Sequence, residues 1–242
     1  MKRVGLVARA DRPDAAPIVR DLVAWLEARG SEVTVDPATA DLLGVNLGGL
    51  GFLTATTLEA LYPALETVLA GRFTAEERMT LDVLHSREGQ APAHQLALND
   101  VVVAKGPLGR LIDVEVRVDG QPMTAYRADG IIIATPTGST AYNLSAAGPI
   151  LFPTMDAVVL TPICAHALTN RSIALPGSVV LEVSLVSDAP DVVLSVDGQA
   201  ARPVAARDVI RVERAPTRVR LVRDPHKSYF EVLRAKLKWG ER

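Results

Sequence analysis

Cysteine, histidine and aromatic residues are scarce in this sequence. Its 242 residues include one cysteine and four histidines, and aromatic residues make up 4% of the chain. Cys164 has no second cysteine with which to form a disulfide, and its one near histidine, His166, has no further ligand-spaced partner to complete a zinc site. We therefore expect a reducing compartment, the cytoplasm, and no residues that hold a structural metal.

Net charge and long apolar runs are also limited. The formal net charge is -2 and the isoelectric point is near 6.1, so the chain lacks the basic field that attracts nucleic acid or anionic membranes. No stretch approaches the roughly 20 apolar residues that span a bilayer. The N-terminus starts with the basic residues of a signal peptide, but Asp11 and Asp14 interrupt it before an apolar segment develops. We expect neither nucleic acid nor a membrane as a partner.

Hydrophobic residues, by contrast, make up 48% of the chain, which is enough for one large or two small domains. Strand-like segments at Val4–Ala8 and Glu32–Val35 flank a helix-like segment at Ala15–Arg29, which is the opening of a Rossmann-like α/β sheet. The run Leu42–Leu47 also reads as a strand, yet only about six residues separate it from the previous one. A parallel crossover needs roughly a dozen or more. The chain therefore either returns antiparallel here or has lost a piece.

Two further helices are expected. The stretch Leu58–Leu69 has its apolar residues on one helical face, with Thr54 and Thr57 as candidate caps. The end of the chain, Ser228–Trp239, returns to helical spacing. We expect this last helix to pack back on the N-terminal domain.

From about Met79 onward, the pattern has period two. Valines alternate with charged residues in 114–118, and turn pairs such as Asp119-Gly120 and Asp197-Gly198 separate later short apolar runs. This layout predicts an all-β antiparallel sandwich. We therefore expect an α/β domain of residues 1–72 with about 224–242, and an all-β domain of residues 73–223.

The most unusual stretch is Ala128–Ile150, in which an apolar strand runs into a segment dense in glycine, serine and threonine. One interpretation is a strand, a turn and a helix capped by the hydroxyl of Thr137, Ser139 or Thr140. The other is a ligand site, where small side chains admit a ligand to the backbone, hydroxyls and N–H groups bind ribose or phosphate, and Tyr142 stacks on a base. Composition alone is compatible with both.

A family resemblance favours the ligand site. The segment TPTGSTAYNLSAAGP after an ADG turn resembles the signature of the NAD kinase family. Three other stretches, Gly44–Thr54 (GVNLGGLGFLT), Leu98–Val101 (LNDV) and Ser195–Gln199 (SVDGQ), are similar to further family motifs, as is the tail FEVLRAKLKWG. They occur in family order over nearly the whole chain. By local rules alone, each of the short motifs would be read as a turn.

The resemblance implies an enzyme that transfers a phosphoryl group from ATP or polyphosphate to the 2′-hydroxyl of the adenosine ribose of NAD, giving NADP, with Mg²⁺ or another divalent metal. It also implies a nucleotide-binding role for the α/β domain, an NAD-binding role for the β domain, and a homodimer or homotetramer. Carboxylates and amides form hydrogen bonds with ribose hydroxyls and base edges, and the arginine guanidinium pairs with the charge of a pyrophosphate. The residues that the resemblance places in the NAD site are Asn99, Asp100, Arg110, Arg127, Asp129, Thr140, Ala141, Tyr142, Asn143, Leu144, Ser145 and Gln199.

One family motif is absent. NAD kinases carry a GGDGT loop before the GVN strand, and its aspartate is the presumed base that takes the proton from the 2′-hydroxyl; this sequence has no GGDGT. The family order places the loop between Ala40 and Leu43, where the strand spacing is also too short. A natural deletion, an engineered one and a flexible segment not included in this sequence all fit. Catalytic residues are therefore left unassigned, and the alternative function is a catalytically inactive NAD(P)-binding module.

Overall fold

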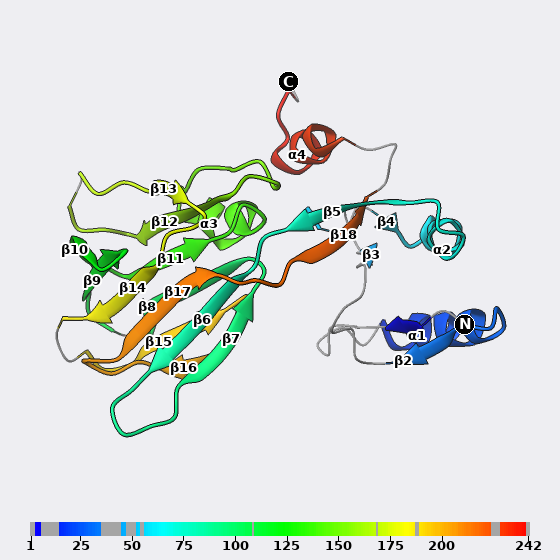
Figure 1. The fold of residues 1–242 in the computed structure, drawn as a ribbon. Helices are drawn as coiled ribbons and strands as arrows, with labels where there is room; N and C mark the ends of the chain where they lie inside the picture. The colour runs from blue at the N-terminus through cyan, green and yellow to red at the C-terminus, as the bar shows by residue number, and fades with distance from the viewer. Residues whose placement is uncertain are drawn as a thin grey trace. The chain divides into compact units, whose positions relative to one another are not determined.

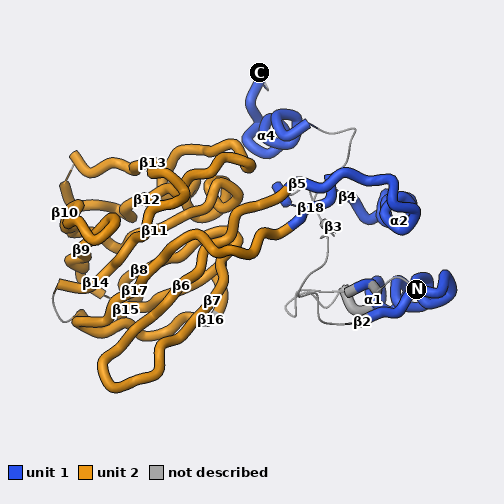
Figure 2. Tube along the Cα trace, in the orientation of Figure 1, with its two compact units in different colours: residues 1–76, 220–242 blue, residues 77–219 orange. Residues whose placement is uncertain are grey.

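The computed structural model describes residues 3–5, 15–34, 45–46, 52–53, 56–107, 109–167, 169–186, 189–223 and 228–240. The chain forms two compact units, one made of residues 1–76 with 220–242 and the other of residues 77–219 (Figure 2). In sequence, the second unit is therefore an insertion within the first.

The first unit opens with a strand, a helix and a parallel strand. Strands β1 (Arg3–Gly5) and β2 (Glu32–Thr34) pair in parallel, and helix α1 (Ala15–Glu27) connects them (Figure 1). The chain leaves the helix through Gly30, whose φ of 71° favours glycine. This order confirms the α/β start predicted from the sequence. No helix in the described ranges is long and apolar enough to cross a membrane.

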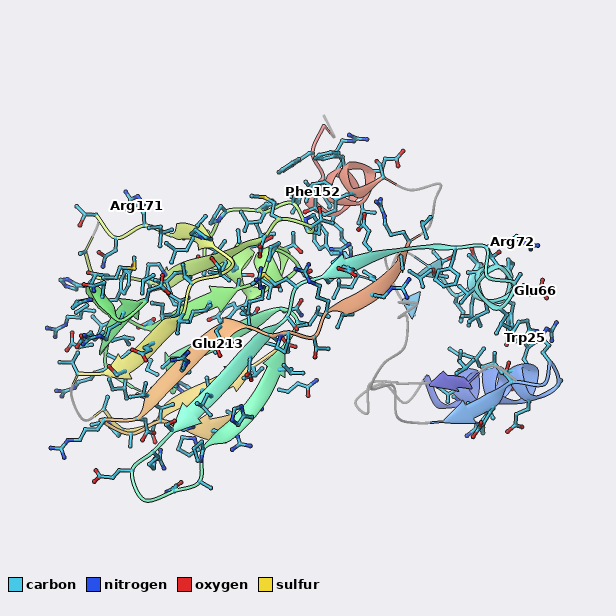
Figure 3. All side chains as sticks on the ribbon, in the orientation of Figure 1. Trp25, Glu66, Arg72, Phe152, Arg171 and Glu213 are labelled. Atoms are coloured by element: carbon cyan, nitrogen blue, oxygen red, sulfur yellow. The ribbon has the colours of Figure 1, made fainter. Side chains whose placement is uncertain are left out.

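The core of this unit joins two helices. Leu22 and Leu26 of α1 recur on one face and form a cluster with Leu61 and Leu65 of helix α2 (Leu61–Leu69). At the same helix pair, the rings of Trp25 and Tyr62 lie 5.2 Å apart between their centres. Figure 3 labels Trp25 and Glu66, which are linked through Arg29: its guanidinium lies 3.7 Å from the Trp25 ring and donates to the Glu66 carboxylate at 3.2 Å.

One expectation for this unit is wrong in detail. Helix α2 begins at Leu61 rather than Leu58 and has Ala60 as its N-cap without a side-chain bond, because Thr56–Thr57 form strand β4. Strand β3 (Val45–Asn46), the described part of the expected strand at 42–47, pairs in parallel with β4 and not with β2. The candidate cap Thr54 lies outside the described residues.

The C-terminal helix α4 (Tyr229–Leu237) belongs to the first unit. It begins with a capping box: the Ser228 hydroxyl accepts the N–H of Glu231 at 3.2 Å, and the Glu231 carboxylate accepts the N–H of Ser228 at 2.6 Å. This arrangement satisfies two N–H groups that have no partner within the helix.

The second unit consists of two six-stranded sheets in which neighbouring strands run antiparallel, in the orders β10-β9-β14-β17-β6-β7 and β13-β12-β11-β8-β15-β16 (Figure 1). A separate two-stranded sheet pairs β5 with β18. The bounds of all these strands are β5 (Thr74–Arg78), β6 (Leu81–Ser86), β7 (Ala93–Ala97), β8 (Asp100–Lys105), β9 (Ile112–Val118), β10 (Gln121–Ala128), β11 (Gly130–Ala134), β12 (Ala157–Ile163), β13 (Ile173–Pro176), β14 (Leu181–Leu185), β15 (Val192–Val196), β16 (Gln199–Pro203), β17 (Val209–Arg214) and β18 (Val219–Arg223).

One large apolar cluster contains residues from both sheets, such as Val114 of β9 and Ile131 of β11. In β9 the buried residues Ile112, Val114 and Val116 alternate with charged ones, as the period-two pattern requires. The predicted antiparallel sandwich is therefore confirmed.

The central strands of the second sheet differ from this pattern because both of their faces are covered. Strand β11 is buried at every position, and Ile132 and Ala134 belong to a second cluster with Val102 of β8. Ala146, which follows the TPTGSTAY segment, packs against this cluster. The segment thus lies against the outer face of the sheet, which explains why these strands are continuous apolar runs.

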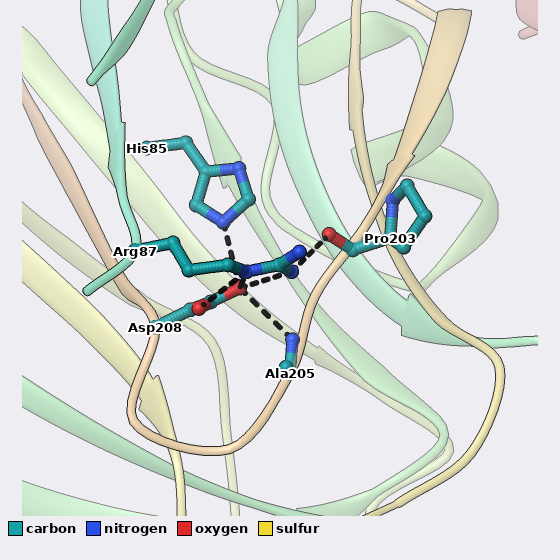
Figure 4. Close-up of polar contacts among 5 residues, drawn as sticks. All are labelled: His85, Arg87, Pro203, Ala205 and Asp208. Atoms are coloured by element: carbon teal, nitrogen blue, oxygen red, sulfur yellow. Dashed lines mark hydrogen bonds and ion pairs between the residues drawn. The ribbon is translucent and has the colours of Figure 1, made fainter. Parts of the chain in front are cut away.

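A buried ion cluster joins the two sheets at one edge. In Figure 4, His85 and Arg87 converge on Asp208, which is 2% exposed; His85 Nε2 lies 2.9 Å from its carboxylate and Arg87 donates to it at 2.7 Å. Arg87 also donates at 2.9 Å to the carbonyl of Pro203, which ends β16 of the other sheet. Burial alone would raise the pKa of Asp208, but the hydrogen bonds from Arg87, the Ala205 N–H and His85 lower it to about 2.

Candidate functional site

The predicted site residues of the β unit fall into two groups at opposite ends of the central strands. Strands β8 and β11 pair antiparallel, with Asp100 opposite Ala134 and Ala104 opposite Gly130. Residues just before β8 and just after β11 therefore share one end, and residues after β8 and before β11 share the other. Four residues at about 3.4 Å each separate the two ends by about 14 Å.

The first end centres on Asp100, whose side chain is buried. The residue is only 4% exposed, and its carboxylate accepts a hydrogen bond from the backbone N–H of Tyr142. Burial and the negative charge of Asp197 raise the pKa of Asp100 to about 6, while the Tyr142 N–H opposes this shift. Asp100 therefore keeps its proton to a higher pH than an ordinary aspartate does.

Asp197 holds the backbone around the Asn99-Asp100 pair. Its carboxylate accepts the N–H groups of Leu98, Asn99 and Asp100 at 2.8, 2.7 and 3.1 Å. Its own N–H donates to the carbonyl of Asp100 at 2.9 Å. The hairpin between β15 and β16 therefore fixes the start of β8.

The start of the TPTG segment packs on the other side of the same backbone. The Thr135 hydroxyl donates to the carbonyl of Leu98 at 2.6 Å, and the Thr135 N–H donates to the carbonyl of Asn99 at 2.9 Å. Gly138 is in such close contact that a Cβ there would lie 2.0 Å from the Asn99 carbonyl oxygen. Only glycine allows this approach.

The rest of the segment forms a 3₁₀ turn η1 (Gly138–Thr140) and a short helix α3 (Tyr142–Ser145). Neither has a side-chain N-cap: the N-cap residues are Thr137, whose side chain makes no capping bond, and Ala141, which has no hydroxyl. The hydroxyls of Ser139 and Thr140 donate to carbonyls three residues earlier, at 2.7 and 3.3 Å. The capping interpretation is therefore wrong here, and these hydroxyls tighten the turn instead.

Asn143 has a structural position. It is fully buried; its amide donates to the carbonyls of Ser139 and Pro149 at 2.9 and 3.0 Å, and its oxygen accepts from the Thr161 hydroxyl at 2.7 Å. Both ends of this side chain are bonded within the protein. A direct contact between the Asn143 side chain and a ligand does not fit this arrangement.

The other residues of this end remain accessible to different degrees. Tyr142 is 45% exposed, and Ser145 and Gln199 are also exposed. Thr140, Ala141, Leu144 and Asn99 are partly buried. The structure thus brings together nine of the predicted residues, around one buried carboxylate: Asn99, Asp100, Thr140, Ala141, Tyr142, Asn143, Leu144, Ser145 and Gln199.

The remaining three predicted residues, Arg110, Arg127 and Asp129, lie towards the other end of these strands, where Asp129 directly precedes β11. The Asp129 carboxylate is 2.9 Å from Lys105 Nζ, which also donates to the carbonyl of Gly109 at 2.9 Å. Arg110 and Arg127 are exposed. Within one chain, these three residues therefore do not lie beside Asp100.

Sequence reasoning missed four residues that shape the site: Asp197, Thr135, Gly138 and Lys105. Asp197 had a signal, since it lies in the SVDGQ stretch, but its pair with Gly198 was read as a turn. No local pattern marks Lys105 as the partner of Asp129, because the two meet only through the pairing of β8 with β11.

The described residues contain no group of three His, Cys, Asp or Glu side chains that could hold a metal ion. The carboxylate of Asp197 is already bonded to three N–H groups. The residues present in the described part of the site therefore do not fit a divalent ion held by the protein alone. The expected position of the GGDGT loop, between residues 40 and 43, lies outside the described residues.

Solved structures share this fold. Yeast NADH kinase complexed with NADH matches with a TM-score of 0.77 and 29% identity, over 84% of this chain and 60% of that one. An NAD kinase from Archaeoglobus fulgidus in complex with ATP matches with a TM-score of 0.75 and 21% identity, over 98% and 99% of the two chains. The predicted fold class, an α/β domain with a β sandwich, is confirmed.

Curated relatives are longer than this chain. The NAD kinases of Geotalea daltonii and Geobacter sulfurreducens are each 43% identical to it, with 100% of both proteins covered. The alignments run over 284 positions whereas this chain has 242 residues, so about 42 positions of each alignment have no residue of this chain. Because 100% of each protein is covered, these positions lie within the alignment.

The family comparison agrees with the site. The family model described as ATP-NAD kinase C-terminal domain matches residues 98–224, which is more than half of the chain. The match starts at the backbone that Asp197 holds and ends just after β18. Together with relatives that are 43% identical over the full length, it confirms the resemblance seen in the motifs: this chain belongs to the NAD kinase family.

Proposed function

We propose that this chain is an NAD kinase, which transfers a phosphoryl group from ATP, or from polyphosphate, to the 2′-hydroxyl of the adenosine ribose of NAD and releases NADP. The observation that carries the proposal is the Asn99-Asp100 pair, held from both sides at the start of β8 next to the TPTGSTAY segment. Support also comes from the relatives named NAD kinase and from neighbours solved with NADH and with ATP.

The chemistry of this end suits the adenosine part of NAD. An ionised carboxylate accepts hydrogen bonds from ribose hydroxyls, and an amide pairs with a hydroxyl or a base edge. Because Asp100 is 4% exposed, a hydrogen bond to it is shielded from water and is stronger than one at the surface. The exposed ring of Tyr142 offers a stacking surface for a base.

The second group of residues supports a homodimer or homotetramer. Asp129, which directly precedes β11, lies about 14 Å along the strands from Asp100, too far to contact the same part of a ligand. A neighbouring copy of the chain could bring its own arginines to the pyrophosphate of an NAD molecule bound at Asp100. Sedimentation velocity of the purified protein, with and without NAD, measures this assembly.

In this proposal the phosphoryl donor, ATP or polyphosphate, binds together with a divalent cation. Mg²⁺ or another divalent ion neutralises the phosphate charge of the donor, and we place it on those phosphates because the described carboxylates form no metal site. We place the enzyme in the cytoplasm, in keeping with its single cysteine.

The segment that is absent from this chain has a predictable effect on rate. In the family resemblance, its GGDGT aspartate takes the proton from the 2′-hydroxyl, and a positioned general base typically contributes about 10²–10⁴-fold to a rate. The groups that remain can still orient NAD. We therefore expect a kcat about 10²–10⁴-fold below that of the Geotalea daltonii enzyme, and weaker binding of NAD, because the same segment would supply part of the nucleotide cradle.

One assay tests the function. NADP formed from NAD, ATP and Mg²⁺ is measured with an NADP-specific dehydrogenase, and the intact mass of the same sample is compared with 25.8 kDa. Asn99→Ala should weaken NAD binding and lower NADP formation, whereas Gln121→Ala, an exposed residue of β10, should change neither. A sample of the correct mass that binds NAD but forms no NADP would contradict the kinase assignment.

A further inference from the structure

The tetrapeptide Val-Asp-Gly-Gln occurs twice, at Val118–Gln121 and at Val196–Gln199, and each copy closes a β hairpin. The aspartate and glycine have φ values of 49° and 75° in the first copy, and of 52° and 68° in the second. Two successive residues with positive φ are typical of the tightest hairpin turns. Local sequence and local geometry are therefore the same in both copies, and only the tertiary contacts differ.

The two aspartates contact very different partners. The Asp119 carboxylate accepts one hydrogen bond, from the N–H of Val180 at 2.8 Å. The Asp197 carboxylate accepts three, from the consecutive N–H groups of residues 98 to 100 at 2.7 to 3.1 Å. It does so although its negative charge faces the carboxylate of Asp100. A turn does not require this repulsive contact, because Asn-Gly makes the same turn without a charge.

The carbonyl groups of the same backbone are bonded by Thr135. Its hydroxyl donates to the Leu98 carbonyl at 2.6 Å and its N–H donates to the Asn99 carbonyl at 2.9 Å. Thr135 is fully buried, so its side chain cannot touch a ligand. The short segment 98–100 is therefore fixed on its N–H side by Asp197 and on its carbonyl side by Thr135.

We propose that Asp197 and Thr135 are positioning residues for NAD: they fix the backbone of residues 98–100 so that the side chains of Asn99 and Asp100 are oriented before the ligand binds. The inference rests on the proposed function, since NAD is the ligand. A site that is ordered in advance loses less conformational entropy on binding, and its supporting contacts decide the affinity.

The first test compares the two copies of the turn. Asp197→Asn keeps the turn preference and one acceptor oxygen, but it places an NH₂ group against an N–H donor. We expect its Kd for NAD, measured by isothermal titration calorimetry, to rise at least 10-fold. Asp119→Asn, the same substitution in the same tetrapeptide, should bind NAD within twofold of the wild type.

The second test removes a contact on the carbonyl side of the segment. The Thr135 hydroxyl also accepts the N–H of Gly138 at 3.0 Å, so the substitution to valine loses both hydrogen bonds. Thr135→Val removes the hydroxyl at nearly constant shape, and Thr135→Ser retains it. We expect Thr135→Val to weaken NAD binding about 10-fold and Thr135→Ser to restore it to within about threefold of the wild type. A purely structural role would lower the unfolding temperature and leave the Kd of the folded protein unchanged.

The outcomes separate the inference from the function. If the wild type binds NAD and both Asp197→Asn and Thr135→Val bind it equally well, the positioning role is overturned while the proposed function stands. If the wild type does not bind NAD, the proposed function itself is overturned. If Asp197→Asn does not fold, the Thr135 pair decides the inference alone.

Discussion

The buried carboxylate of Asp100 lowers the stability of the folded protein when it is ionised, but it also provides a group that can bind a ligand. Its pKa of about 6, against an ordinary 3.8, means that the folded state holds the proton more tightly than the unfolded state. Stability therefore falls as pH rises from about 4 to about 6, and above that range the ionised carboxylate costs about 3 kcal/mol.

Asp100→Asn should remove this cost. We expect the free energy of unfolding at pH 8 to rise by about 1–3 kcal/mol, and the gain to disappear as the pH approaches 4. The Kd for NAD should increase, because the amide is a weaker acceptor than a carboxylate. Urea denaturation across this pH range, with calorimetric titration of NAD, measures both. A variant that is no more stable than the wild type at pH 8 would contradict the prediction.

Gly138 is the tightest contact between the TPTG segment and the start of β8. In Gly138→Ala, the new methyl group would meet the Asn99 carbonyl oxygen at 2.0 Å, so the backbone must move. We expect a loss of about 2–3 kcal/mol in the free energy of unfolding and weaker NAD binding. Gly106→Ala, whose methyl group would lie 3.0 Å from Asp191, should cost less than half of this.

The duplicated tetrapeptide marks the limit of what the sequence can predict about single residues. Family motifs pointed to Asn99, Asp100 and the 140–145 segment, and the structure brings these residues to one end of β8. They could not reveal that Asp197 holds the backbone while Asp119 only closes a turn. That difference depends on which strand lies beside each hairpin, and strand order is not a local property.

Strands were easier to predict than helix ends. Period-two alternation identified strands such as β9, because one face of each is buried and the other is not. The start of α2 was misplaced by three residues, because Thr56–Thr57 pair as a strand and hydroxyl caps were expected instead. Tertiary pairing overrode a local preference there.

The ion cluster at Asp208 should contribute to the free energy of unfolding of the β sandwich. Asp208→Asn leaves Arg87 and His85 without their buried anion, so we expect a loss of about 3 kcal/mol at pH 7. Because the folded pKa is depressed to about 2, this stabilisation is present above about pH 4 and is lost as the pH falls towards 2. Chemical denaturation at several pH values follows this loss.

An exposed pair provides the control. Asp156 and Arg214 are also 2.7 Å apart, but their side chains are 58% and 37% exposed. Asp156→Asn should therefore cost less than about 1 kcal/mol. Equal costs for the two substitutions would show that burial is not what makes the Asp208 cluster important.

The β unit should fold without the rest of the chain. Its large apolar cluster lies wholly between Met79 and Val212, inside residues 77–219. A protein made of residues 77–219 should unfold in one cooperative transition, which circular dichroism during heating can follow. A broad transition, or an unfolded fragment, would mean that the unit needs the first 76 or the last 23 residues.

The α/β unit was predicted from the first strand, helix and strand of the sequence. The GGDGT motif, which carries the catalytic aspartate of the family, is absent from this sequence. The relatives align over 284 positions against 242 residues here, so the difference is about the size of a strand-helix-strand unit. The strand spacing predicts one gap between residues 40 and 43, because a parallel crossover has a minimum length.

The two-part arrangement of the first unit has a consequence for how the protein is made. The chain enters and leaves the β unit side by side, since the Thr80 hydroxyl donates to the Thr217 carbonyl and the Ala215 N–H donates to the Thr80 carbonyl. On the ribosome, residues 77–219 emerge before residues 220–242, which include α4. The inserted sandwich can therefore finish folding before residues 220–242 are synthesised, and these later residues complete the unit that was started first.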